Sequence, residues 1–494
     1  DKNLQAIAQK VAEKGLVENK AKRVSILIMN PQNGEILAMV NKPDFDPNNP
    51  FEGYEDFIGE TDAEKLQKMW RNSLVNDTFE PGSIFKVITM STAIEEGLVS
   101  ESDTFECGGS LQVGPHTIHC WKRSGHGTQI LPEILQNSCN VGFMKLGEKI
   151  GAEKLVEYIK KFGFGQVSGV DLPGEARGII KSAENMNDAD LATISFGQTN
   201  TVNAVQYMTA YNAIVNGGTL IQPHVMKYIS HVDSTGNTVV DEVFEPKTTE
   251  NVISEETAAT LRDYLERTVN QGGSNKVYIE GYHIGAKTGT AQKVNPLTGS
   301  YESGKYISSM AGFATVENPQ ITVFLSIDEP SNGAYYAGVV TAPLGKVLLE
   351  DIFNYLDSDF SKDENLISKD IVIPELRGLS ISEAKKLLKE YNLECTVEGD
   401  GETITNMQPY PGYTIKEGST INLYTDENAT YNKDVAMPDV RGYSKESAIE
   451  LLDSLGIKYI LQGDGVVINQ NIPSGELISE GTTVKLTLSA EYGD

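Results

Sequence analysis

An internal repeat constrains the fold of one part of this chain more tightly than any other feature of the sequence. Residues 373–393 and 437–457 align at an offset of 64 residues, so that Pro374 matches Pro438. The Gly-Asp-Gly turn that begins at Gly399 also recurs 64 residues later. Each copy has the pattern of a strand, an amphipathic helix and further strands separated by Gly and Pro turns. Two copies are too few for a solenoid, so we expect two small separate modules.

The repeat predicts βαβ-type modules at 368–427 and 433–491. Polar segments with many Asp, Asn and Lys residues precede the two modules, at 358–370 and 426–434. Such segments bury little apolar surface, and we interpret them as linkers.

The size and charge of the whole chain limit its class and its partners. A chain of 494 residues exceeds what one hydrophobic core usually serves. Its 41 Lys and Arg against 69 Asp and Glu give a net charge of −28, which argues against nucleic acid and anionic membrane surfaces as partners. No run of about 18 apolar residues is present. Because the chain opens on a helical pattern without a signal peptide, we expect it to be a fragment of a longer protein.

The part before the repeats predicts an α+β domain at 1–360. Alternating apolar residues favour a hairpin at 23–40 and a second strand pair at 307–328, with helical patterns dominating between them up to about residue 220. Strands from both ends of the segment then share one sheet. We interpret residues 1–20 as the remnant of an N-terminal linker.

One stretch of this domain, Glu80 to Met90 (EPGSIFKVITM), pairs a hydroxyl with an amine. Its apolar residues have helical spacing, and Pro81 and Gly82 mark the entry of the helix. Ser83 and Lys86 then lie on one face, where the amine can take the hydroxyl proton. A capped helix with an extended lysine is the alternative interpretation.

Two further segments carry matching chemistry. Ser138 and Asn140 supply a hydroxyl and a carboxamide between two helical patterns. Lys287 to Thr290 (KTGT) place an amine and hydroxyls on a predicted strand, with a glycine that allows close approach of another backbone.

The ordered set SxxK, SxN and KTG resembles that of penicillin-binding proteins and class A β-lactamases. Segments such as GEILAMVNKPDFDPN, GFGQVSGVDLPGE and MAGFATVENP extend the resemblance, and over about residues 20–357 the chain is similar to class B penicillin-binding proteins. The repeated modules resemble PASTA domains. The resemblance implies a serine β-lactamase/transpeptidase-like fold, with an antiparallel sheet covered by helices on both sides.

The resemblance also implies a role for each motif residue. Ser83 is the expected nucleophile, which attacks the penultimate D-Ala carbonyl of a peptidoglycan stem peptide, and Lys86 is the expected base. Burial and the charge of Lys287 are expected to lower the pKa of Lys86. Ser138 is expected to pass a proton to the departing D-Ala, and Asn140 to bind the substrate amide.

The KTGT strand is expected to bind the substrate as an added edge strand. Lys287 and the hydroxyls of Thr288 and Thr290 are expected to bind the terminal carboxylate of the substrate. Gly289 has no side chain and is expected to let another backbone approach the strand closely. The backbone N–H groups of Ser83 and Thr290 are the implied oxyanion hole.

The implied function is a monofunctional peptidoglycan DD-transpeptidase that β-lactams acylate. The alternatives are a DD-carboxypeptidase or β-lactamase, or a sensor in which the PASTA modules bind muropeptides beside a vestigial acyl site. A class A lactamase needs an E-x-x-L-N pattern after the SxN motif, and the sequence has none after Asn140. The role in elongation, division or sporulation stays open.

The resemblance further implies where the protein works and with what. We expect a single-pass membrane protein, anchored by a helix that precedes residue 1, with its catalytic domain on the extracytoplasmic side. A cell-wall glycosyltransferase and division or sporulation proteins are the expected protein partners. No cofactor is required for the chemistry.

Three of the four cysteines, Cys107, Cys120 and Cys139, cluster near histidines. Three interpretations stay open: a structural zinc site, a Cys107–Cys120 disulfide, or free thiols. Soft thiolates with an imidazole suit zinc, and Cys107, Cys120, His126 and Cys139 are the candidate ligands. His119 is the alternative imidazole, although beside Cys120 on an extended chain it points the other way.

Overall fold

The computed structural model describes residues 1–494 except 296–297, 357–369, 427–432, 442 and 490–494. The chain divides into two compact units, 1–363 and 364–494. The two predicted linkers lie largely outside the described residues. Within the described ranges, no helix combines the length and the hydropathy needed to cross a bilayer.

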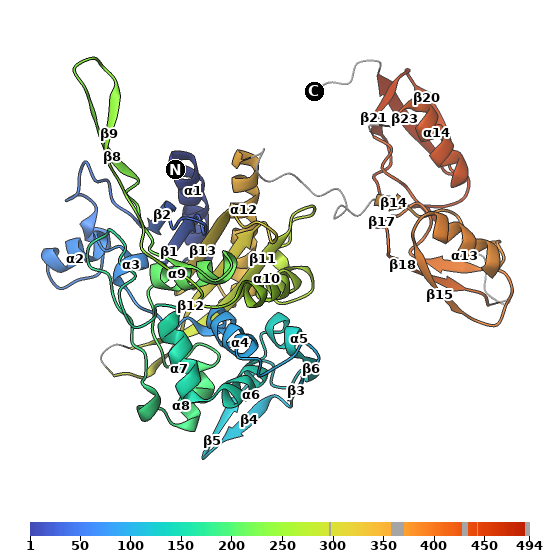
Figure 1. Ribbon diagram of the computed structural model, residues 1–494. Helices are drawn as coiled ribbons and strands as arrows, with labels where there is room; N and C mark the ends of the chain where they lie inside the picture. Colours follow the sequence, from blue (N-terminus) through green and yellow to red (C-terminus); the bar gives the residue numbers. More distant parts are fainter. Residues whose placement is uncertain (296–297, 357–369, 427–432, 442, 490–494) are drawn as a thin grey trace. The chain divides into compact units, whose positions relative to one another are not determined.

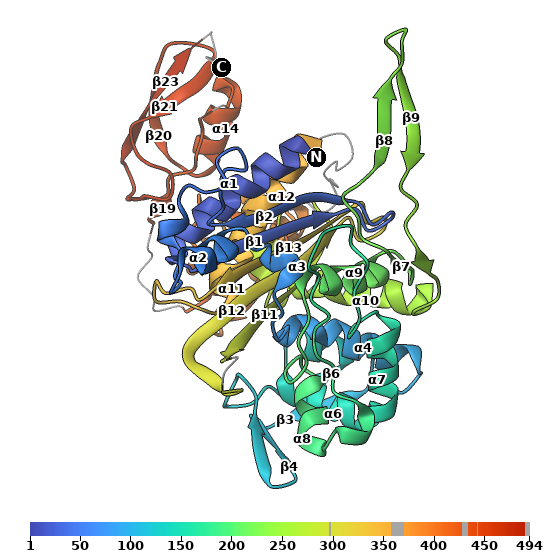
Figure 2. The ribbon, with the colours of Figure 1, turned by 90° about the vertical axis from the view of Figure 1, so that its left-hand side faces the viewer.

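A five-stranded antiparallel sheet forms the centre of the first unit, in the order β11-β12-β13-β1-β2. Its strands are β1 (Arg23–Met29), β2 (Ile36–Lys42), β11 (Ile284–Val294), β12 (Tyr301–Ala314) and β13 (Ile321–Asp328). The predicted α+β class and the two predicted strand pairs are confirmed. The sheet joins strands from the two ends of the unit, and β11 lies at its edge (Figure 2).

Helices α1 (Lys2–Asn19) and α12 (Ala342–Leu356) cover one face of this sheet (Figures 1 and 2). Leu4, Ala8 and Val11 of α1 are buried in the same core as the inward-facing residues of β1 and β13. The interpretation of residues 1–20 as a linker remnant is therefore wrong. The segment is an amphipathic helix whose apolar side completes the core.

The opposite face carries most of the helices, including α4 (Lys86–Glu95), α6 (Asn140–Ile150), α9 (Ala204–Val215) and α10 (Glu255–Asn270). All residues of α9 are buried, including the polar side chains of Gln206, Thr209 and Asn212, so the helix lies within the core. The other helices of this unit are η1 (Tyr54–Asp56), α2 (Asp62–Met69), α3 (Ser73–Asn76), η2 (Gly82–Phe85), α5 (Leu131–Gln136), α7 (Ala152–Lys161), η3 (Ala183–Asn185), α8 (Asp188–Ile194), η4 (Asn275–Val277) and α11 (Ala337–Val340).

Short strand pairs interrupt the region that was expected to be mainly helical. They are β3 (Thr104–Cys107) with β6 (Gly127–Ile130), and β4 (Ser110–Val113) with β5 (His116–His119). Beyond α9, β7 (Leu220–Ile221) pairs with β10 (Thr248–Thr249), and β8 (Tyr228–Val232) pairs with β9 (Thr238–Val243). These strands are too short to give a clear alternating pattern.

The second unit contains the two predicted βαβ-type modules, each with its own core. The first has β14 (Asp370–Val372), α13 (Ile381–Glu390), β15 (Glu394–Glu398), β16 (Asn406–Gln408), β17 (Thr414–Lys416) and β18 (Thr420–Tyr424). The second has β19 (Val435–Ala436), α14 (Lys445–Ser454), β20 (Lys458–Gln462), β21 (Val466–Gln470), β22 (Leu477–Ile478) and β23 (Thr483–Ser489). Ser380 and Ser444, which are 64 residues apart, cap the two helices in the same way.

Candidate active site

Ser83 lies in the 3-10 turn η2, immediately before helix α4. The expected helix therefore begins one tight turn later than the periodicity indicates. Tyr207 of α9 donates a hydrogen bond of 2.9 Å to the carbonyl of Ile84, and Gly82 N–H donates one of 2.8 Å to Gly197 O. Gly197 has φ 91°, and a Cβ there would lie 1.9 Å from Gly82 O, so only glycine fits. These contacts fix the turn that carries the half-buried Ser83.

Lys86 is fully buried and makes three hydrogen bonds. Its Nζ donates to Ser138 O at 2.8 Å, to Ser138 Oγ at 3.1 Å and to Asn140 Oδ1 at 2.8 Å. It also lies 5.3 Å from the ring centre of Phe143 on α6, a contact that the sequence did not signal. Burial lowers the pKa of Lys86 to about 7, although the nearby thiols of Cys139 and Cys120 act in the opposite direction. The amine is therefore neutral for part of the time near pH 7.

Ser138 joins the two lysines. Its Oγ accepts hydrogen bonds from Lys86 Nζ at 3.1 Å and from Lys287 Nζ at 3.0 Å. The residue has φ 50°, a left-handed backbone conformation that is uncommon for residues other than glycine and is frequent at functional sites. Both the carbonyl and the hydroxyl of Ser138 face Lys86 as a result.

Lys287 lies on β11 and is almost fully buried. Burial and the positive charge of Lys86 lower its pKa well below the usual range. The sequence predicted that the charge of Lys287 would lower the pKa of Lys86. In the structure, the repulsion between the two amines lowers the pKa of Lys287 instead, and burial lowers the pKa of Lys86.

Gly289 explains how β11 approaches the nucleophile turn. A Cβ at this position would lie 3.1 Å from both Ile84 N and Pro81 O. The absence of a side chain lets this face of β11 lie directly against η2 and leaves the outer edge of the strand open. The SxxK, SxN and KTG segments therefore meet in one place.

The side chains of Thr288 and Thr290 are half-buried and lie on the opposite face of β11 from Lys287. Thr290 Oγ1 accepts a hydrogen bond of 2.9 Å from Ala337 N at the start of α11. This contact occupies one acceptor position and leaves the hydroxyl proton free to donate.

Glu80 is a further residue of this site that sequence reasoning did not single out, although it lies in the same motif. Its carboxylate is buried and accepts hydrogen bonds from Thr199 N at 2.8 Å and from Tyr301 Oη at 3.0 Å. Burial raises the pKa of Glu80. The residue ties η2 to the loop after α8 and to the start of β12.

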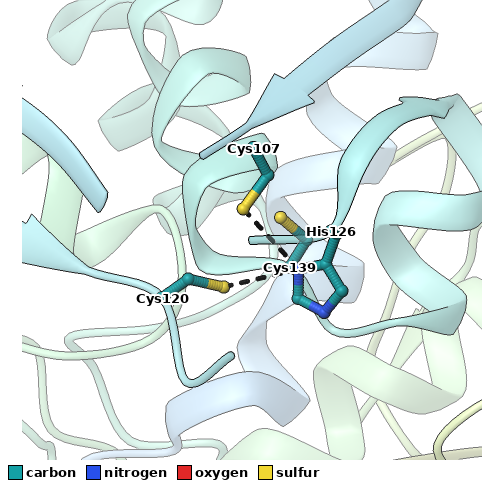
Figure 3. A group of neighbouring side chains, drawn as sticks. All are labelled: Cys107, Cys120, His126 and Cys139. Carbon is teal, nitrogen blue, oxygen red and sulfur yellow. Dashed lines mark hydrogen bonds between the residues drawn. The ribbon is translucent and has the colours of Figure 1, made fainter. Parts of the chain in front are cut away.

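The four candidate metal ligands lie together (Figure 3), and one of them, Cys139, is the residue between Ser138 and Asn140. Their ligand atoms are all within 4.8 Å of one another, and His126 Nδ1 lies 3.6 Å from both Cys107 Sγ and Cys120 Sγ. Two ligands at about 2.3 Å and 2.0 Å from a tetrahedral zinc ion are about 3.6 Å apart. The spacing thus fits that ion.

Local backbone contacts build this group, which we call the Cys3His cluster (Cys107, Cys120, His126 and Cys139). His126 N donates 3.0 Å to Cys107 O, and Cys139 Sγ caps helix α6 by accepting from Gly142 N at 3.3 Å. Cys139 therefore connects the cluster to Ser138 and Asn140 on either side of it.

The structure also bears on the alternatives for the cysteines. All four are free thiols, so the Cys107–Cys120 disulfide is absent. His119 is exposed on β5 and lies outside the Cys3His cluster, as its place next to Cys120 predicts. Cys395 lies in the first repeat module.

Comparison with known proteins agrees with this geometry. Residues 24–350 match the penicillin binding protein transpeptidase domain, and residues 371–427 and 435–490 match the PASTA domain. The chain is 36% identical over 438 residues to Stage V sporulation protein D of Bacillus subtilis, covering 86% of this chain and 64% of that protein. It is 30% identical to the probable peptidoglycan D,D-transpeptidase PenA of Neisseria flavescens, covering 72% of this chain and 81% of that protein.

Solved structures give the same result for the fold. Penicillin-binding protein 3 from Mycobacterium tuberculosis is similar with a TM-score of 0.64 at 29% sequence identity, covering 74% of this chain and 80% of that one. The chain spans less than two thirds of the length of the Bacillus relative and half that of mycobacterial PbpB. With a transpeptidase domain followed by two PASTA domains, the chain belongs to the class B penicillin-binding proteins.

Proposed function

We propose that this protein is a serine-type D-Ala-D-Ala transpeptidase that cross-links peptidoglycan stem peptides and that β-lactams acylate. The observation that carries this proposal is the position of Ser138 Oγ, 3.1 Å from Lys86 Nζ and 3.0 Å from Lys287 Nζ, next to the turn of Ser83. Relatives named peptidoglycan D,D-transpeptidases, and the similar mycobacterial protein solved with aztreonam and with ampicillin, support it.

Acylation begins when neutral Lys86 takes the proton of Ser83 Oγ. The alkoxide attacks the carbonyl of the penultimate D-Ala, and the backbone N–H groups of Ser83 and Thr290 stabilise the oxyanion. Lys86 can then return the proton through Ser138 to the leaving D-Ala amine, because the hydroxyl accepts from one neighbour while it donates to another. An acceptor amine then attacks the acyl-enzyme through the reverse of these steps, which frees Ser83 and forms the cross-link.

Substrate binding uses the open edge of β11. An extended peptide can pair with this edge as an additional strand, and Lys287 with the hydroxyls of Thr288 and Thr290 can bind its terminal carboxylate. Asn140 is held by Lys86 through Oδ1, and its Nδ2 makes only a long contact of 3.5 Å to His119 O. That amide group is thus available to a substrate carbonyl.

A turnover assay tests the reaction. The protein is incubated with a thioester analogue of the stem peptide, with and without a D-amino acid acceptor. We expect an aminolysis product that increases with acceptor concentration, and none from Ser83→Ala. If the product is hydrolysed peptide and its yield does not fall when the acceptor is added, the carboxypeptidase alternative is supported. If the protein is acylated but releases no product, the sensor alternative is supported.

The setting that we propose follows from the relatives. We infer an extracytoplasmic catalytic domain on a protein anchored by an N-terminal membrane helix, working with a cell-wall glycosyltransferase. The name of the Bacillus relative favours a role in sporulation over division. Deleting the gene and following spore cortex formation against vegetative division tests this role, and a division defect with normal cortex would contradict it.

We also propose that the Cys3His cluster binds one structural zinc ion. Three thiolates and one imidazole at tetrahedral spacing form a closed structural site without a position for substrate. His126 Nδ1 faces the sulfurs of Cys107 and Cys120 at 3.6 Å each, and the buried Nε2 of the same ring has no hydrogen-bond partner among the described residues. The ion would brace the turn of Ser138 from behind.

Elemental analysis of the purified protein should give one zinc per chain, and a chelator should lower the melting temperature. Cys139→Ala should lose the metal, whereas Cys395→Ser, which changes a thiol of the first repeat module outside the cluster, should keep it. Full metal content in Cys139→Ala, or none in the wild type, would contradict the assignment.

A further inference from the structure

The hairpin of β8 and β9 stands clear of the body of the transpeptidase domain (Figures 1 and 2). Every residue of its two strands is exposed. In the part of the chain that the structure describes, β8 pairs only with β9, and an isolated two-stranded ribbon is marginally stable in water. The hairpin therefore has the properties of an element that is completed by a partner.

One face of the hairpin is free of charge. Tyr228, Ser230 and Val232 of β8 lie on this face, with Thr238, Val240 and Val243 opposite them on β9. The four large apolar side chains among them, Tyr228, Val232, Val240 and Val243, are between 50% and 67% exposed. A contiguous apolar strip of this kind marks an interaction surface.

The two edges of the hairpin differ in their protection against strand pairing. The β9 edge carries a bulge at Asp241, where the register shifts between Ile229 and Ser230, and it also carries Glu242. Bulges and charges are the usual means of blocking an edge. The β8 edge is regular and contains neither a bulge, a proline nor a lysine between Tyr228 and Val232. β8 is thus the edge open to a further strand.

The hydrogen bonds within the hairpin show which groups of β8 point outward. Lys227 O accepts from Phe244 N at 3.0 Å, and Asp233 N donates to Asn237 O at 2.9 Å, so the odd-numbered residues face β9. The N–H and C=O groups of Tyr228, Ser230 and Val232 therefore point away from the hairpin.

The sequence of this edge is complementary to itself. When two copies of the segment KYISHVD (227–233) pair antiparallel about Ser230, the outward groups of Tyr228 meet those of Val232, and Ser230 meets Ser230. The same register sets Lys227 opposite Asp233 at both ends. The apolar strips of both copies then lie on one face.

We propose that the β8 edge is a self-association surface, on which two copies of this chain pair β8 to β8 and form a four-stranded sheet. Within one copy Lys227 forms an ion pair of 3.1 Å with Glu35, but the lysine side chain is 70% exposed, so that it can exchange Glu35 for Asp233 of the second copy at little cost. At about 0.15 M salt, charges more than about 8 Å apart are screened, so the net charge of −28 does not prevent the contact.

Sedimentation velocity of the whole chain between about 1 and 500 μM tests this proposal. Since two five-residue strands bury a small area, we expect a monomer–dimer equilibrium in this range. Ser230→Lys sets two ammonium groups opposite each other on the twofold axis and should weaken the dimer about tenfold or more. Ser230→Glu should act in the same way.

A mixture of the Lys and Glu variants should recover the dimer, because position 230 then pairs opposite charges. Thr238→Lys, on the same face but on β9, is the matched control and should leave the equilibrium unchanged. The rate of acylation by a labelled penicillin should be the same in all variants, which would show that each variant is folded. A wild-type chain that stays monomeric, or a dimer that Ser230→Lys does not weaken, would overturn the proposal.

Discussion

At the residue scale, the site depends on two buried amines that share one hydroxyl. Neither Lys86 nor Lys287 has a carboxylate partner among its described hydrogen bonds, and burial favours the neutral form of each. The spacing of Lys86 to Ser83 made it the expected base, and the expected proton path already placed the Ser138 hydroxyl beside a lysine. The bonds of Lys86 to Ser138 O and Asn140 Oδ1 could not be predicted, because they depend on the local backbone, which is left-handed at Ser138.

The pH dependence of acylation follows from Lys86. Only the neutral amine can accept the Ser83 proton, and with a pKa of about 7 the neutral fraction increases as pH rises. We expect the second-order rate constant for a labelled penicillin to rise about tenfold from pH 6 to pH 8. Lys86→Arg keeps the charge at every pH and should lower the rate on the order of 100-fold or more. A profile that is flat over this range would contradict the role of Lys86.

Removal of the Ser138 hydroxyl tests the proton path. Ser138→Ala should lower the acylation rate by a factor on the order of 10² to 10⁴. Ser91→Ala is a suitable control, because Ser91 is a buried serine on the helix that begins at Lys86, and within the described ranges its Oγ donates only to Ile88 O of that helix. Equal rates for the two variants would show that the Ser138 hydroxyl carries no proton.

At the element scale, the site is built where an edge strand meets a tight turn. The strands at 23–40 and 307–328 were predictable because alternating apolar residues extend over their whole length. The order of the strands in the sheet was not predictable, because the neighbouring strands β1 and β13 are far apart in sequence. The short strands around the Cys3His cluster escaped prediction because each spans four residues.

Gly289→Ala tests the contact between β11 and η2. The added Cβ would lie 3.1 Å from backbone atoms of Pro81 and Ile84, so the turn that carries Ser83 must move. We expect at least about a tenfold loss of acylation rate, in line with the 10²-fold effect of a misplaced catalytic group. Gly273→Ala meets its nearest neighbour at 3.5 Å, an ordinary contact, and should react as the wild type does. Unchanged acylation in Gly289→Ala would mean that this approach is not required.

At the scale of the whole molecule, the first unit draws its candidate site from three segments that are distant in sequence. The sequence indicated which segments these are through the order SxxK, SxN and KTG, and the structure supplies the reason that they meet. Helix α9 supports η2 through Tyr207, α6 begins beside Ser138, and the sheet presents Lys287 on its edge strand. The repeat modules were predictable for a different reason, because each is a local unit with its own core.

The position of the covalent adduct tests directly whether Ser83 is the nucleophile. Trypsin releases residues 72–86, which contain Ser83 and one other serine, Ser73. After reaction with penicillin, tandem mass spectrometry should place the added mass on Ser83, and the Ser83→Ala protein should carry none. An adduct on any other residue, or one that persists in Ser83→Ala, would contradict the convergence of these three segments around Ser83.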